Sequence, residues 1–209
     1  MSILKISLLI LSYLIGSFPT GVVISKSFFH KDIRDYGSGN IGTTNTFRVL
    51  GKKAGVIVLI FDFFKGTVCA LLPMFFNLEH SLAIFCGLAA VLGHAFSIFL
   101  KFKGGKSVAT TAGFILGYNL QYFICCFFVF IPLLLITSTV SLSALLTMPI
   151  IVIISLFFHD LYLTILMAFI LVLIYVSHRE NIKRIIHGKE NHVNFGLYYW
   201  LVLSKKGQD

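Results

Sequence analysis

Long apolar segments separated by short polar ones run through this chain and restrict what it can fold into. Ile3–Ser25, Ala54–Asn77 and Ser81–Leu100 are each close to the ~20 residues that a helix needs to cross the ~30 Å core of a bilayer. Only 12% of the 209 residues are charged, whereas soluble proteins have roughly 25%. The sequence therefore predicts an all-α, polytopic integral membrane protein whose first apolar segment is retained as a span.

Positive charge is concentrated in three polar segments between the apolar ones. The formal net charge is +9, and all but two of the 17 Lys and Arg residues, Lys5 and Lys65, fall in these segments or, as Lys205 and Lys206 do, after the third one. Basic clusters that alternate with apolar runs are typical of cytoplasmic loops under the positive-inside rule. We therefore expect that these basic residues lie next to a lipid bilayer and that the protein binds no nucleic acid. The polar loops 26–53, 101–107 and 178–192 are predicted to lie on the cytoplasmic side.

The last long apolar stretch, 108–177, has basic segments on both sides, so it should cross the membrane an even number of times. Two crossings would need overlong helices, whereas four would have about 17 residues, or ~26 Å, each. Polar breaks favour four short helices, near 108–118, 122–136, 143–158 and 161–177. The chain is then a single domain, 1–209, of seven transmembrane helices, with the N-terminus outside and the C-terminus cytoplasmic. Five spans are the alternative.

The first polar loop contains "GSGNIGTTNTFR" at residues 37–48. Closely spaced glycines let backbone N–H groups converge on an anion. Side-chain donors are frequent here too, and Arg48 can hold a phosphate through two hydrogen bonds. The sequence predicts a phosphate-binding loop, with an ordinary flexible loop as the alternative. The candidate donors are Ser38, Thr43, Thr44 and Asn45.

The second polar loop, "KFKGGKS" at residues 101–107, places Lys106 just before a predicted helix. The N-terminus of a helix attracts anions, which favours a phosphate-binding role for Lys106. The nucleotide-binding P-loop pattern is not met, because Leu100 stands where its first glycine belongs. Lys101 and Lys103 are interpreted as residues that flank the membrane.

The third polar segment is "HRENIKRIIHGKE" at residues 178–190. His178, Asn181 and Arg184 would share one face of a helix. Because His178 lies where the last span leaves the membrane, its imidazole could donate to a phosphate oxygen. A solvated basic helix held by lipid headgroups is the alternative. The following "NFGLYYWLVL", with Lys205 and Lys206, is typical of an interfacial anchor.

Two further features concern residues inside the apolar segments. Asp62 and Lys65 are one helical turn apart and can form an ion pair. This pair either has a function or only lets each residue neutralise the charge of the other. The four cysteines all lie in apolar segments, so we expect small buried side chains without disulfides. No carboxylate-rich cluster is visible, and no metal or cofactor is expected.

These motifs resemble the bacterial acyl-phosphate:glycerol-3-phosphate acyltransferases over nearly the whole chain. They occur in order as "GSFPTG", "DIRDYGSGNIGTTNTFR", "FDFFKG", "GHAFSIFLKFKGGKSVAT" and "HRENIKRIIHGKE". Thr43 and Ser107 depart from the family pattern, which has Ala and a further glycine there. The resemblance implies seven helices in the bacterial cytoplasmic (inner) membrane, with a site facing the cytoplasm.

The implied reaction transfers a fatty acyl group from acyl phosphate to the 1-hydroxyl of sn-glycerol 3-phosphate. Lysophosphatidic acid and phosphate are the implied products, and an enzyme that forms acyl phosphate is an implied partner. The residues implied to bind glycerol 3-phosphate are Ser38, Arg48 and Lys106. Those implied to hold acyl phosphate are Gly42, Thr43, Thr44, Asn45, Ser143, His178 and Asn181. Among these, His178, Asn181, Lys106 and Arg48 are the candidate catalytic residues.

Because acyl phosphate is already activated, we hypothesise that a substrate phosphate oxygen accepts the hydroxyl proton. His178 is the rival base. A transporter of organic phosphates is the alternative function, and a purely structural membrane subunit is a third.

Overall fold

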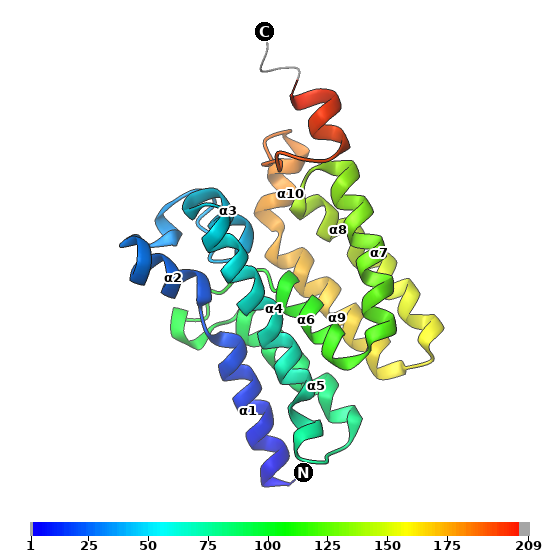
Figure 1. The fold of residues 1–209 in the computed structure, drawn as a ribbon. Helices are drawn as coiled ribbons and strands as arrows, with labels where there is room; N and C mark the ends of the chain where they lie inside the picture. The colour runs from blue at the N-terminus through cyan, green and yellow to red at the C-terminus, as the bar shows by residue number, and fades with distance from the viewer. Residues whose placement is uncertain (1, 205–209) are drawn as a thin grey trace. The chain divides into compact units, whose positions relative to one another are not determined.

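The structure is a computed structural model that describes residues 2–204. Within that range every regular element is a helix or a helical turn, which confirms the all-α fold (Figure 1). The contacts of the chain divide it into two compact units, Met1–Leu120 and Gln121–Asp209. That the chain acts as a single domain stays a prediction.

The elements follow the predicted apolar segments closely. The first unit contains α1 (Ile3–Ser17), α2 (Thr20–Phe29), α3 (Thr43–Leu50), α4 (Lys52–Phe75), α5 (His80–Ala95) and α6 (Val108–Tyr118), with 3-10 turns at Ile33–Asp35 and Ile98–Leu100. The second contains α7 (Leu120–Thr137), α8 (Val140–Ser155), α9 (Leu161–Ser177) and α10 (Arg179–Ile186), with a 3-10 turn at Leu156–Phe158 and a π-helical turn at Tyr199–Leu203.

Four helical segments of the described chain are long and apolar enough to cross a bilayer: Lys52–Phe75, His80–Leu100, Leu120–Thr137 and Val140–Phe158. Two bent pairs, α1 with α2 and α9 with α10, meet the same test together, and α6 is a shorter apolar helix. Helices therefore occupy all seven predicted segments. The number of crossings and the orientation of the termini stay predictions.

The predicted first span, Ile3–Ser25, is divided between two helices. The chain bends by 43° between α1 and α2, where Phe18 has a non-helical ψ of 118°. Pro19 causes the break, because proline disfavours a helical residue before it and lacks the N–H that continues the ladder. The break leaves irregular backbone beside α4, where the Lys65 ammonium contacts the Phe18 carbonyl oxygen.

Helices of the first unit approach each other closely at glycines. A side-chain carbon at Gly66 of α4 would overlap the Thr110 carbonyl oxygen, and one at Gly113 of α6 would overlap the Phe63 carbonyl oxygen. α1 and α5 meet in the same way at Gly16. Small residues are typical of helix contacts in membranes, because dispersion contacts replace the hydrophobic effect there.

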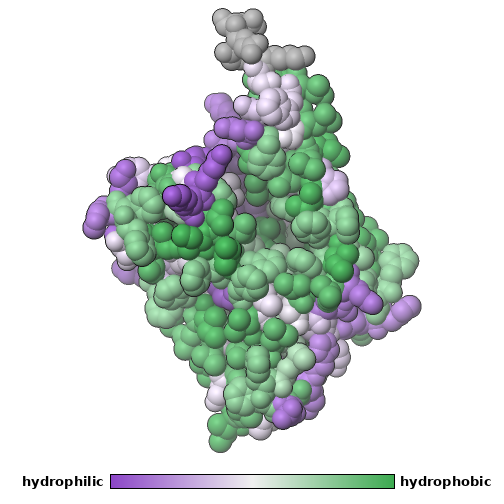
Figure 2. Space-filling model, viewed as in Figure 1, coloured by the Kyte–Doolittle hydropathy of each residue, from purple (hydrophilic) through white to green (hydrophobic). Residues whose placement is uncertain are grey.

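The outer surface of the described helices is strongly apolar. Figure 2 shows hydrophobic residues over most of the face in view. Of the large apolar side chains in the described helices, Phe61 and Phe64 of α4 and Phe128 of α7 are more than half exposed. An apolar area of this kind is unusual on a soluble monomer and suits contact with lipid chains.

The segment after α10 is fastened to the α7–α8 turn within the second unit. The Val193 N–H donates to the Ser138 carbonyl oxygen (2.8 Å), and the Tyr199 N–H donates to the Ser138 hydroxyl (3.0 Å). His192 Nδ1 lies 2.8 Å from the Thr139 hydroxyl. Trp200 is exposed, as an interfacial anchor requires. The other residues of that prediction, Lys205 and Lys206, lie outside the described part of the chain.

Candidate active site

The Gly-Asn-Thr loop is organised around the side chain of Asn45. This amide is almost fully buried, and its Nδ2 donates toward three carbonyl oxygens, those of Ile33 (3.3 Å), Tyr36 (3.1 Å) and Asn40 (2.9 Å). Its Oδ1 accepts the Ser38 N–H at 2.9 Å. The loop is therefore folded onto one amide, which holds Ser38 at a fixed place.

Gly37 and Gly39 complete this loop because both have left-handed backbone angles, with φ of +63° and +69°. Such angles favour glycine. A side chain at Gly37 would also overlap Asn45 Oδ1. Two of the three spaced glycines noted in the sequence therefore let the chain wrap around Asn45.

The predicted acyl-phosphate residues Thr43 and Thr44 begin helix α3, which Gly42 caps. The Thr46 N–H donates to the Gly42 carbonyl oxygen (3.1 Å), so the helical ladder starts there. N–H groups in the first turn of a helix lack intrahelical acceptors, and they attract anions. Arg48 follows Thr44 by four residues, which places both on the same side of the helix. The sequence predicted a loop here without this helix.

Asp32 and Arg34 form an ion pair at the start of the same loop. Asp32 accepts bonds from Arg34 Nε (2.8 Å) and Nη2 (2.6 Å), and its carboxylate lies 3.0 Å from Lys26 Nζ. The hydrogen bonds from Arg34, and then the bond from Lys26, hold the pKa of Asp32 well below its usual range. The Asp32 carboxyl, five residues before the first glycine of this loop, is therefore a poor proton acceptor at neutral pH.

The segment that carries Lys106 lies along the end of α5. The Gly104 N–H donates to the Ala95 carbonyl oxygen (3.0 Å), and the Gly105 N–H donates to that of His94 (2.9 Å). A side chain at Gly105 would overlap His94 Nε2. Lys106 therefore follows two glycines that must stay small, and it directly precedes Ser107, the N-cap of α6.

A small apolar cluster connects the two polar loops of the first unit. Val22, Ile33 and Ile41 form its buried core, and Leu100 packs against them. Ile41 lies inside the Gly-Asn-Thr loop, and Leu100 directly precedes the loop 101–107. The structure therefore joins both predicted glycerol-3-phosphate loops to one small core.

In the second unit, His178 lies between α9 and α10 and is almost fully buried. Its Nδ1 is 2.8 Å from the carbonyl oxygen of Ile174. Because a carbonyl only accepts, Nδ1 must carry a proton, and the neutral ring then presents Nε2 as an acceptor. His178 is thus held in one tautomer by the end of α9.

Asn181 and Arg184, on α10, share a carboxylate that sequence reasoning missed. Asn181 Nδ2 donates to Glu190 Oε1 and Arg184 Nε donates to Glu190 Oε2, both at 2.8 Å. The Glu190 side chain is only 8% exposed. The one sequence feature that could have pointed to Glu190 is its position at the end of the third motif, "HRENIKRIIHGKE". Glu190 fixes the amide of Asn181 and folds the end of the motif back onto α10.

Ser143 lies in the first turn of α8, which begins at Val140 and so earlier than predicted. Its hydroxyl donates to the Thr139 carbonyl oxygen (2.8 Å) and lies 2.9 Å from the Thr137 hydroxyl. Thr139 also contacts His192. The turn around Ser143 is therefore tied to the segment after α10.

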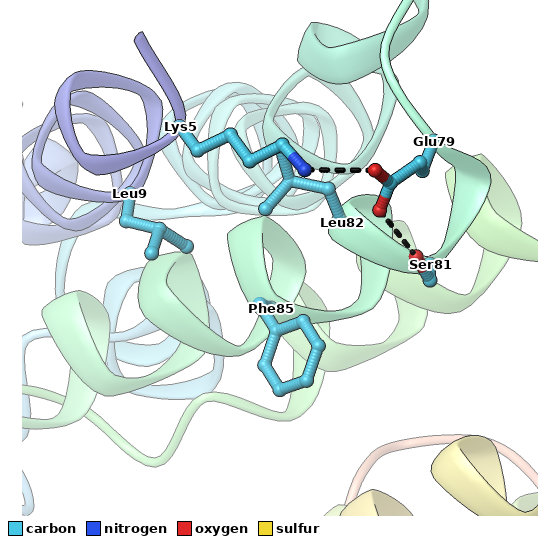
Figure 3. Close-up of a pocket in the computed structure, with 6 residues that line it drawn as sticks. All are labelled: Lys5, Leu9, Glu79, Ser81, Leu82 and Phe85. Atoms are coloured by element: carbon cyan, nitrogen blue, oxygen red, sulfur yellow. Dashed lines mark hydrogen bonds and ion pairs between the residues drawn. The ribbon is translucent and has the colours of Figure 1, made fainter. Parts of the chain in front are cut away.

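A surface pocket in the first unit lies apart from these loops. It is formed by α1, the α4–α5 turn and the start of α5, and the residues that line it are Lys5, Leu9, Glu79, Ser81, Leu82 and Phe85 (Figure 3). Lys5 Nζ lies 2.8 Å from Glu79 Oε1, and this pairing lowers the pKa of Glu79. The pocket contains none of the predicted site residues, and its polar groups are already paired.

Residues 6–188 match the family described as glycerol-3-phosphate acyltransferase. The chain belongs to the glycerol-3-phosphate acyltransferase family. Glycerol-3-phosphate acyltransferase 2 of Lactobacillus acidophilus is 61% identical over 196 residues, 93% of each chain. The glycerol-3-phosphate acyltransferase of Latilactobacillus sakei is 53% identical over 198 residues, 94% of this chain and 96% of that one.

Solved structures in this acyltransferase family have the same fold. The glycerol 3-phosphate form of PlsY (YgiH), an integral membrane glycerol 3-phosphate acyltransferase, has a TM-score of 0.84 and 35% identity, covering 95% of this chain and 98% of that one. Its lysophosphatidic acid form has a TM-score of 0.80 and 34% identity, covering 90% and 94%. These relatives confirm the resemblance that the sequence motifs indicated, and they confirm an integral membrane fold. The assignment of individual site residues stays a prediction.

Proposed function

We propose that this chain transfers a fatty acyl group from acyl phosphate to the 1-hydroxyl of sn-glycerol 3-phosphate. Lysophosphatidic acid and inorganic phosphate are the products. The observation that carries the proposal is the likeness, over nearly the whole chain, to acyltransferases whose solved forms hold glycerol 3-phosphate and lysophosphatidic acid. None of these relatives is a transporter of organic phosphates, and the proposal does not include that alternative.

The reaction exchanges one carbon–oxygen bond for another. The 1-hydroxyl oxygen attacks the acyl carbon of acyl phosphate, the bond from that carbon to the phosphate oxygen breaks, and phosphate leaves with the electron pair. The hydroxyl proton passes to a phosphate oxygen, so that charge and atoms balance. The chain's task is then to hold two phosphate-bearing molecules in register and to stabilise the leaving anion.

The loops of the first unit suit the binding of glycerol 3-phosphate. Asn45 fixes Ser38, Arg48 extends from the helix that follows, and Lys106 adds a cation at the N-terminus of α6. Guanidinium and ammonium groups bind phosphate through charge-assisted hydrogen bonds. We assign these three residues to glycerol 3-phosphate.

The other predicted residues suit the acyl phosphate. Gly42, Thr43 and Thr44 supply the N-terminus of α3, and the buried pair His178 and Asn181 supplies side chains that Ile174 and Glu190 hold in place. Ser143 is assigned to the same substrate. Asn45 acts through the loop, since its amide already binds four backbone groups.

We place the reaction at the cytoplasmic face of the bacterial inner membrane, with loops 26–53, 101–107 and 178–192 on that side. The positive charge of these loops supports the placement. Acyl phosphate would come from a separate acyl-phosphate-forming enzyme. No metal or cofactor is part of the proposed reaction.

The decisive experiment uses the purified chain in lipid nanodiscs. Phosphate release from acyl phosphate should require glycerol 3-phosphate and should match the lysophosphatidic acid formed. Acyl-CoA should not replace acyl phosphate, and a chelator should leave the rate unchanged. Phosphate release without glycerol 3-phosphate, or a preference for acyl-CoA, would refute the proposed donor and reaction.

The proton acceptor is tested by His178→Asn. Asparagine keeps an N–H donor toward the Ile174 carbonyl oxygen but removes the basic ring. If a phosphate oxygen accepts the proton, kcat should remain within about tenfold of the wild-type value. A loss of three or more orders of magnitude in kcat would make His178 the base instead.

A further inference from the structure

Three ionisable side chains lie together in the interior of the first unit. Asp62 and Lys65, on α4, and His94, on α5, are all at least nine-tenths buried. Lys65 Nζ donates to Asp62 Oδ1 at 2.8 Å, and His94 Nδ1 lies 3.8 Å from the same oxygen. Charged groups at membrane depth are costly and are retained chiefly where they serve a function.

One side of this cluster faces the break between α1 and α2. The Thr20 hydroxyl donates to Asp62 Oδ1 (3.1 Å), and Lys65 Nζ donates to the Phe18 carbonyl oxygen (3.4 Å). The break at Pro19 thus leaves the Phe18 carbonyl oxygen, which a continuous helix would use in its own ladder, within reach of Lys65. The Asp62–Lys65 pair holds the broken first span at α4.

The other side of the cluster faces the segment that carries Lys106. A side-chain carbon at Gly105 would overlap His94 Nε2, so the ring lies directly against that glycine. The Gly105 N–H donates to the His94 carbonyl oxygen (2.9 Å). His94 therefore contacts the segment with both its backbone and its ring, one residue before Lys106.

The His94 ring is also oriented by what surrounds it. Its Nδ1 is buried without a hydrogen-bond partner in the described structure, and the charged groups that face it are Asp62 and Lys65 of α4. The edge of the ring that carries Nδ1 therefore faces Asp62 of α4. The opposite edge then meets Gly105.

We propose that Asp62, Lys65 and His94 form a positioning cluster for the binding of glycerol 3-phosphate. Asp62 and Lys65 keep the ring of His94 in place, and the ring packs against Gly105. This contact fixes the backbone next to Lys106, so that the Lys106 ammonium reaches the substrate phosphate. These residues act through Lys106 and do not touch the substrate. The inference rests on the proposed function, because it assigns the cluster to one of the two substrates.

The main test compares His94→Ala with His94→Gln. Alanine removes the ring beneath Gly105, so the KM for glycerol 3-phosphate should rise about tenfold, while the KM for acyl phosphate changes less than about twofold. Glutamine places an amide nitrogen near the position of Nε2 and should restore most of the loss. Thr67→Val is the matched control, because Thr67 is a buried polar residue of α4 that bonds the Gly113 carbonyl oxygen instead. It should change neither KM.

The ion pair is tested by Asp62→Asn and by Asp62→Asn/Lys65→Met. The single variant leaves a buried ammonium uncompensated and should unfold at a lower temperature, whereas removal of both charges should restore stability. If the pair also positions His94, the folded double variant keeps a raised KM for glycerol 3-phosphate. A double variant with wild-type kinetics would reduce the pair to a structural role and would overturn its part in the proposal.

Trypsin gives a measurement that needs no catalysis. Without substrates, cleavage after Lys103 and Lys106 should be faster in His94→Ala than in Thr67→Val, since the segment loses its support. Equal cleavage with an unchanged KM for glycerol 3-phosphate would overturn the positioning role. A kcat loss with both KM values unchanged would also overturn it. If the wild-type chain showed no phosphate release dependent on glycerol 3-phosphate, the proposed function would fail, while the cleavage comparison would still report on the cluster.

Discussion

Replacement of Asn45 by alanine should loosen the Gly-Asn-Thr loop even when no substrate is present. The amide donates toward the carbonyl oxygens of Ile33, Tyr36 and Asn40 and accepts the Ser38 N–H. Its two N–H hydrogens and one oxygen make roughly three net hydrogen bonds, each with a contribution of ~1 kcal/mol. The free energy of local opening should therefore fall by about 3 kcal/mol.

Hydrogen exchange measured by mass spectrometry reports this opening directly. A loss of about 3 kcal/mol corresponds to roughly 100-fold faster exchange for peptides that cover 33–42, because every 1.4 kcal/mol is a factor of ten. Asn40→Ala is the matched control. Asn40 Oδ1 accepts a single hydrogen bond within the described loop, from the Gly42 N–H (2.9 Å), so its loss should accelerate exchange only about fivefold.

Two results would contradict this reasoning. Equal acceleration in Asn45→Ala and Asn40→Ala would show that the amide does not organise the loop. Unchanged exchange together with a raised KM for acyl phosphate would show that Asn45 acts mainly as a substrate ligand, as the resemblance implied.

Two further predictions concern other parts of the first unit. Gly113→Ala should lower the unfolding temperature more than Gly117→Ala. The added carbon would overlap the Phe63 carbonyl oxygen at position 113, whereas at position 117 it would lie 2.7 Å from the Thr67 carbonyl oxygen. Equal shifts of the unfolding temperature would contradict the close α4–α6 contact. Asp32 should titrate below the usual range by carbon-13 NMR, and Arg34→Gln should raise its pKa more than Lys26→Gln. Because the folded pKa is lowered, the Asp32 contacts stabilise the loop above about pH 4 and are lost as the pH falls below that value. The reverse order of the two variants would refute the dominant role of Arg34.

Hydropathy and charge placement predicted most of the fold, because an apolar run long enough to cross a bilayer has few other uses. The break at Pro19 was missed although proline is visible in "GSFPTG", since a proline inside a membrane helix is often tolerated. Helix α3 was missed because its eight residues, "TTNTFRVL", follow a glycine loop and contain no long apolar stretch.

The site residues were harder to assign, for a physical reason. In a loop of small polar residues, the sequence does not show which groups turn inward, and Asn45 turns inward. His94 resembles an ordinary core histidine in "GHAF", because its partner Gly105 approaches only after the chain returns along α5. Glu190 lies nine residues from Asn181, too far for helical spacing to pair them.

The glycine contacts between α4 and α6 also restrict where the ion pair can lie. A lysine inside a membrane helix usually lowers its cost by snorkelling, which means that its ammonium reaches along the helix toward the headgroups. Gly66 and Gly113 hold α4 and α6 in backbone contact, so a slide of α4 along α6 would bring larger side chains into that contact. Lys65 keeps its ammonium on Asp62, one helical turn away, so the place of this charge along α4 is set by a neighbouring carboxylate and not by reach toward a headgroup.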